Sequence, residues 1–178
     1  MIVFLDTEFT DLLQPQLLSL GLVTLDGREH YVELDLATDI GRARRQASSE
    51  FVRYGGVLDL WGRVAGAACT DWDLGRRTGE WLLGLAAGTG EKVEVAFDYS
   101  TDFELLEATI RNAGLWERVR EVVWPVNVAR LVSTIDAELA AEECWRAVGT
   151  RGLARHHALA DALALRTAYA RVKGLAVA

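Results

Sequence analysis

The chain has only two cysteines among its 178 residues and no Cys-x-x-Cys pair. Cys69 and Cys144 lie far apart in the sequence, so we expect two reduced thiols and no disulfide. No apolar run reaches the ~20 residues that a membrane-spanning helix needs. The first residues also lack the basic start and small-residue cleavage site of a secretory signal. These absences predict a cytoplasmic protein that does not enter a membrane.

Positive charge is also scarce. The chain has 19 Lys and Arg residues against 26 Asp and Glu, which gives a formal net charge of −7. That balance argues against a broad, non-specific coat on DNA, but it is compatible with a site that holds a few nucleotides at one strand end. The length and the 51% hydrophobic content fit a single globular domain, residues 1–178.

The hydrophobic pattern predicts an α/β fold in which a meander of three strands precedes alternating helices and strands. The expected strands are 1–5, 16–25, 29–36, 93–97 and 121–128, and the expected helices are 71–87, 103–113, 133–148 and 156–172. The turn signal Asp26-Gly27 makes the second and third strands antiparallel neighbours. Residues 37–70 lack a clear period and are expected to be partly helix and partly loop. This order predicts a mixed sheet flanked by helices.

Two carboxylates, Asp6 and Glu8, directly follow the first expected strand. Residues i and i+2 of an extended chain point to the same side, so these two side chains converge at the rim of the sheet. Neighbouring carboxylates repel each other unless a cation lies between them. The pair therefore predicts a site for a hard divalent metal ion.

Two later segments place acidic residues at helix starts. Asp98 and Asp102 follow the fourth expected strand, and Asp161 lies in the first turns of the last expected helix. Each has a structural explanation when it is taken alone, because Asp often caps a helix. His156 and His157 precede Asp161, and a histidine with a pKa near neutrality can act as a general base. The three acidic sites and a histidine together indicate a catalytic centre.

These residues resemble the three motifs of the DEDDh 3′–5′ exonucleases, the DnaQ-like family with a ribonuclease H-like fold. The first motif, DxE, corresponds to Asp6-Thr7-Glu8. The third, HxAxxD, corresponds to residues 156–161, and Ala158 in register selects His156 over His157 as the catalytic histidine. The residues after Asp6, together with the segment 18–23, are most similar to compact stand-alone bacterial exoribonucleases.

The second motif of the family usually reads NxxFDxxxL, and this chain departs from it. Asp102 takes the acidic position, Asp98 stands where the family has Asn, and the usual aromatic residue is missing. Asp98 therefore remains an alternative to Asp102. The three motifs occur in the order found in the family and span nearly the whole chain.

The resemblance implies two Mg²⁺ or Mn²⁺ ions and a two-metal hydrolysis of phosphodiester bonds at RNA 3′ ends. The implied metal ligands are Asp6, Glu8, Asp102 and Asp161, and His156 is the implied base. The resemblance also implies that the backbone after Glu8, with Phe9 and Thr10, meets the terminal sugar and base, and that Leu17 or Leu18 contacts the other face. Phe9 fits either stacking on a base or an ordinary place in the core.

Several alternatives stay open. Single-stranded DNA or short oligonucleotides are alternative substrates, and a non-catalytic nucleic-acid-binding module is the alternative from another class of protein. Arg42, Arg44 and Arg45 fit either a phosphate guide or a solvated basic turn. A homodimer is compatible with the resemblance, and the apolar segment 57–68 is its candidate interface.

Overall fold

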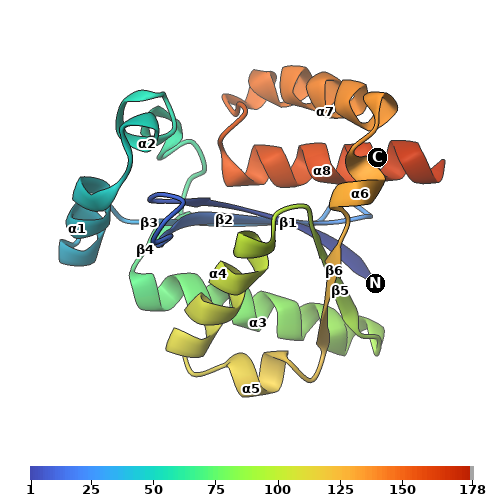
Figure 1. The fold of residues 1–178 in the computed structure, drawn as a ribbon. Coiled ribbons are helices and arrows are strands. Elements are labelled where there is room, and N and C mark those ends of the chain that lie inside the picture. Colours follow the sequence, from blue (N-terminus) through green and yellow to red (C-terminus); the bar gives the residue numbers. More distant parts are fainter. Residues whose placement is uncertain (177–178) are drawn as a thin grey trace.

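The structure is a computed structural model that describes residues 1–176. A six-stranded sheet with the strand order β4-β3-β2-β1-β5-β6 forms its centre (Figure 1). The strands are β1 Ile2–Phe9, β2 Leu17–Thr24, β3 Glu29–Leu34, β4 Ala68–Cys69, β5 Val93–Phe97 and β6 Val123–Asn127. Strand β2 is antiparallel to both β1 and β3, and the other three pairings are parallel. The expected α/β fold with a mixed sheet is confirmed, and it is consistent with a ribonuclease H-like arrangement.

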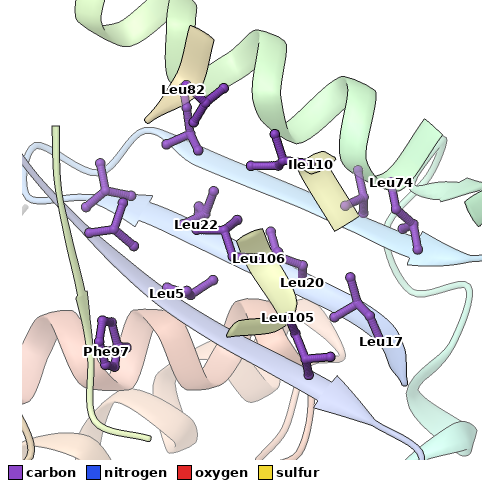
Figure 2. Close-up of a cluster of buried hydrophobic side chains, with 14 of the residues drawn as sticks. Leu5, Leu17, Leu20, Leu22, Leu74, Leu82, Phe97, Leu105, Leu106 and Ile110 are labelled. Carbon is purple, nitrogen blue, oxygen red and sulfur yellow. The ribbon is translucent and has the colours of Figure 1, made fainter. Parts of the chain in front are cut away.

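Helices cover both faces of this sheet. They are α1 Asp39–Ala47, α2 Glu50–Tyr54, α3 Asp71–Thr89, α4 Ser100–Asn112, α5 Trp116–Val119, α6 Ala129–Val132, α7 Ile135–Val148 and α8 Ala158–Lys173. Figure 1 shows α3, α4 and α5 on one face, and α8 on the other, between the sheet and α7. Figure 2 shows leucines of β1 and β2 meeting leucines and Ile110 of α3 and α4 in the main core. No helix within residues 1–176 is long and apolar enough to cross a membrane.

Strand β1 is longer than the sequence pattern predicted. It continues through both carboxylates to Phe9, because β2 lies alongside and pairs Asp6 with Gly21 and Glu8 with Ser19. The short elements α5, α6 and β4 were not predicted, since two to four residues are too few to show a period. In the segment 57–68, Val57 is buried and Trp61 packs against the core of its own chain.

The register of the sheet leaves an opening beside β1. The pairing of β1 with β5 ends at Phe4–Ala96, and the chains continue past that point to Asp6 and Asp98. Strand β1 has an antiparallel neighbour on one side and a parallel neighbour on the other. Open α/β sheets bind ligands at the carboxyl ends of strands, where the order of the strands changes direction. The fold therefore places the acidic residues where such sheets carry out their chemistry.

Helix α8 approaches the sheet closely because β2 has a glycine at position 21. A Cβ at Gly21 would lie 2.4 Å from the carbonyl oxygen of Ala158 and 2.6 Å from the amide nitrogen of Leu159. These are backbone atoms of the first turn of α8, so neither can rotate away. Residues paired across strands share a face of the sheet, so Asp6 points toward α8 as well.

We expect Gly21→Ala to displace the start of α8 and to lower the free energy of unfolding by about 1–3 kcal/mol. Urea unfolding measures this loss. Gly84→Ala in α3 is the matched control, because a Cβ at Gly84 would have nothing within 4 Å, so the substitution should be neutral or stabilising. An unfolding midpoint for Gly21→Ala equal to that of the wild type would contradict the close packing of α8.

Candidate active site

Carboxylates from separate parts of the fold converge at the opening beside β1. Asp6 and Glu8 come from β1, and Asp161 comes from the first turn of α8. Ligand atoms of Glu8, His156 and Asp161 all lie within 4.8 Å of one another. Asp6, Asp98, His156 and Asp161 line one cavity of about 280 Å³. The predicted residues Asp6, Glu8 and Asp161 are thus brought together with His156.

The electrostatics of this cluster are unfavourable without a cation. Burial, followed by the charge of Asp161, raises the pKa of Asp6 well above its usual value. Burial is also the largest cause that raises the pKa of Glu8 to about 8, of Asp102 to about 7 and of Asp161 to about 6. A divalent cation would offset both the repulsion and the lost solvation. The donors are carboxylate oxygens, which suit Mg²⁺ or Mn²⁺.

The backbone at His156 is built around Asp161. His156 has a φ of 68°, in the left-handed region that non-glycine residues seldom adopt. In this conformation its amide donates a hydrogen bond of 2.8 Å to Oδ2 of Asp161. Burial and the charge of Arg155 lower the pKa of His156, which favours a neutral imidazole able to accept a proton. Its ring meets Phe51 of α2 edge-on, with 5.0 Å between ring centroids.

The two adjacent histidines have different surroundings. His157 is 1% exposed, and its ring stacks on Tyr31 with 4.4 Å between centroids. Neither of its ring nitrogens has a hydrogen-bond partner within residues 1–176. Burial lowers the pKa of His157 to about 4. His156 therefore faces the acidic cluster, while His157 packs beneath it.

Both candidate acids of the second motif lie near the cluster. Asp102 in α4 is 3% exposed, and its Oδ1 accepts a hydrogen bond of 2.6 Å from the hydroxyl of Thr7, between Asp6 and Glu8. Asp98 is exposed and lines the cavity that Asp6 also lines. The charge of Asp102 raises the pKa of Asp6 more than the charge of Asp98 does. Asp102 therefore has the larger electrostatic effect on Asp6, while Asp98 shares its cavity.

For the RNA hydrolysis that the motif resemblance implies, we expect Asp102→Asn to lower kcat about 100-fold or more, because it removes a buried carboxylate that acts on Asp6. Asp98→Asn should lower kcat less than about tenfold, since Asp98 lies at the exposed edge of the cavity. Both values are measured at saturating Mg²⁺. A larger loss for Asp98→Asn than for Asp102→Asn would reverse the assignment of the second motif.

The residues predicted to contact substrate have different positions. Phe9 lines a cavity of about 500 Å³ beside Glu8, together with Leu12 and Phe51. The prediction for the side chain of Leu18 is wrong, because Leu18 is 0% exposed and lies in the core. Strand β2 is buried along its whole length, which its sequence pattern did not reveal.

The side chain of Thr10 has a structural role, so a contact between Thr10 and substrate would have to come from its backbone. Thr10 is buried, and its hydroxyl donates to the carbonyl of Gln14 and accepts from the amide of Gln16. It therefore stabilises the loop after β1. Arg44 likewise has a structural role, since it forms an ion pair of 2.6 Å with Asp71 and donates to the carbonyl of Leu17.

Sequence reasoning missed three residues of the site: Phe51, Trp145 and Arg155. Phe51 lies in the segment without a period, and only the fold shows that α2 reaches the cavity beside Glu8. Neither Trp145 nor Arg155 belongs to one of the three motifs. The adjacency of Arg155 to His156 was the one signal available.

No protein-family model matches the chain, and a search of curated proteins found no similar protein.

Proposed function

We propose that the chain is a metal-dependent 3′–5′ exonuclease that hydrolyses phosphodiester bonds from the 3′ end of RNA. The observation that supports this most strongly is the convergence of four carboxylates and one histidine at the end of β1. The four carboxylates, Asp6, Glu8, Asp102 and Asp161, all have raised pKa values. A fold gains no stability from such a cluster, so a function that requires cations is the better explanation.

The residues of the cluster fit two Mg²⁺ or Mn²⁺ ions. Asp6 has interactions with all the other carboxylates, so it is the residue best placed to serve both ions. Glu8 and Asp161 would hold one ion, and Asp102 would support the other. When bound, such ions lower the pKa of water and neutralise charge on the phosphate. His156 would take the proton from the attacking water, because its imidazole lies at the cluster and burial keeps it neutral.

The cavity beside Glu8 suits the terminal nucleotide of a single strand. Phe9 and Phe51 present aromatic surface there, on which a base can stack without regard to its identity. The net charge of −7 is unsuited to a long tract of nucleic acid, but it is compatible with the capture of one end. A non-catalytic binding module is the weaker alternative, because converging carboxylates repel phosphates and would reduce its affinity.

Incubation with 5′-labelled RNA and DNA of matched sequence tests this proposal. We expect a ladder of shortening labelled products in Mg²⁺, no products in EDTA, and faster shortening of RNA than of DNA. Release of a labelled mononucleotide at the outset would contradict the 3′–5′ polarity. Faster shortening of DNA would indicate that single-stranded DNA is the substrate.

The proposed base is tested separately. We expect His156→Asn to lower kcat about 100-fold or more, because general base catalysis contributes roughly 10²–10⁴-fold. Asn also tolerates the left-handed backbone at this position, so the fold should be retained. His157→Phe, measured alongside, should keep most of the activity. Greater loss of kcat in His157→Phe, with an unchanged melting temperature, would move the base by one residue.

A further inference from the structure

Trp145 belongs to none of the three acidic motifs, yet it contacts the candidate metal site directly. It lies in α7, which packs along α8, and its indole Nε1–H donates a hydrogen bond of 2.6 Å to Oδ1 of Asp161. The side chain is half-buried, and it lines the same cavity as Asp6 and His156. A hydrogen bond to a charged acceptor in such a place is stronger than one in water.

The two oxygens of Asp161 are thereby held from two directions. The indole of Trp145 holds Oδ1, and the backbone amide of His156 holds Oδ2. Each carboxylate oxygen has two lone pairs, so each keeps one for a cation. Donors of this kind fix the orientation of a metal-binding carboxylate before the ion arrives, and their loss typically lowers metal affinity about 10–100-fold.

The face of the same indole carries a cation. The guanidinium carbon of Arg155 lies 4.7 Å from the centroid of the Trp145 ring. Arg155 is exposed, and it makes no hydrogen bond or ion pair with the described residues 1–176. Among those residues it is the one Lys or Arg that lines either the acidic cavity or the cavity beside Phe9. A guanidinium held on a ring at the mouth of an acidic cleft can bind a phosphate.

We propose that Trp145 positions two other residues, Asp161 and Arg155. Its N–H orients Asp161 for a divalent ion, and its ring holds Arg155 where the guanidinium binds a backbone phosphate of the single strand. The first part depends only on metal binding by the cluster. The second part rests on the proposed function.

The first part is tested by calorimetric titration of the protein with Mn²⁺, which needs no hydrolysis. Trp145→Phe keeps a ring and removes the N–H, and we expect it to weaken Mn²⁺ binding about 10–100-fold. Arg155→Gln removes a positive charge near the site, so it should leave the affinity unchanged or slightly raise it. Trp124→Phe, in the exposed part of β6, is the control for a Trp→Phe change and should bind as the wild type does. A dissociation constant for Trp145→Phe within about twofold of the wild type would overturn this part.

A second measurement uses the unaltered chain, so it does not depend on the variant folding. The indole N–H resonance of Trp145 should shift on titration with Mg²⁺, with the same midpoint as the calorimetric binding. An indole resonance that stays fixed through saturation would overturn the coupling between Trp145 and the metal site.

The second part is tested by steady-state kinetics on a short RNA. Arg155→Gln should raise KM about tenfold, change kcat less than about threefold and reduce the salt dependence of binding. The KM of Arg155→Lys should lie between those of the wild type and Arg155→Gln, since lysine keeps the charge but lacks the planar group. An unchanged KM in Arg155→Gln would overturn this part. If the wild type hydrolyses no nucleic acid, the proposed function fails, while the Mn²⁺ titration still decides the first part.

Discussion

Asp6→Asn is expected to abolish RNA hydrolysis while it stabilises the metal-free protein. Asp6 is surrounded by the charges of Asp161, Asp102, Glu8 and Asp98, all of which raise its pKa. An amide has nearly the same shape as the carboxyl group but no charge, so it relieves the repulsion and binds divalent ions poorly. Metal ions contribute several kcal/mol to such reactions, so kcat should fall at least ~10³-fold.

The gain in stability appears as a rise in melting temperature, measured in EDTA. For a domain of this size, each 1 kcal/mol gained raises the midpoint by about 2–4 °C. Asp59→Asn is the matched control, because Asp59 is exposed and lies outside the cluster. It should change neither kcat nor the midpoint. Retained activity in Asp6→Asn would contradict its role in metal binding, and a lowered midpoint would contradict the repulsion among these carboxylates.

The metal-free protein is expected to become more stable as the pH falls from about 8 to about 6. Burial raises the pKa of Glu8 to about 8, of Asp102 to about 7 and of Asp161 to about 6. The folded protein therefore binds protons in this window that the unfolded chain does not bind. Stability rises with acidification wherever the folded state binds more protons.

Two buried histidines act in the opposite direction at lower pH. Burial lowers the pKa of His30 and of His157 to about 4, so below about pH 6.5 the unfolded chain takes up protons that the folded protein does not. More carboxylates than histidines change their protonation here, so the histidines should reduce the gain in metal-free stability below about pH 6.5 without reversing it. Saturating Mg²⁺ keeps the carboxylates ionised, so it should raise the melting temperature most at about pH 8.

Thermal melts across this pH range, with EDTA and with Mg²⁺, check both statements. Stability that falls steadily from about pH 8 to about pH 6 in EDTA would contradict the raised pKa values. A melting temperature at about pH 8 that does not respond to Mg²⁺ or Mn²⁺ would contradict a metal site at the cluster.

The sequence could predict the positions of residues that lie on strands or helices with a clear apolar pattern. Asp6 and Glu8 share a face because alternation along a strand requires it, and Asp161 follows from the start of a well-marked helix. The order of the strands and helices along the chain could be predicted for the same reason. The motif register favoured His156, and the structure places its ring, not that of His157, at the acidic cluster.

The residues that the sequence misplaced or missed owe their positions to contacts between distant elements. An apolar run such as 17–24 does not reveal whether one or both faces are covered, so Leu18 was predicted at a surface that it does not reach. The bond from Trp145 to Asp161 needs the packing of α7 on α8, which no local pattern encodes. Phe51 reaches the site from a short helix of five residues, too brief for a periodic signal.

A crystal structure with Mn²⁺ and a nucleoside monophosphate, read from anomalous scattering, would test the two-metal site without any assay of activity. We expect two separate Mn²⁺ peaks, both contacting Asp6, with the imidazole of His156 outside the coordination sphere. Glu8, His156 and Asp161 also lie close enough to hold one ion by themselves. A single peak bound by those three residues, with the His156 ring as a ligand, would contradict the two-metal nuclease site.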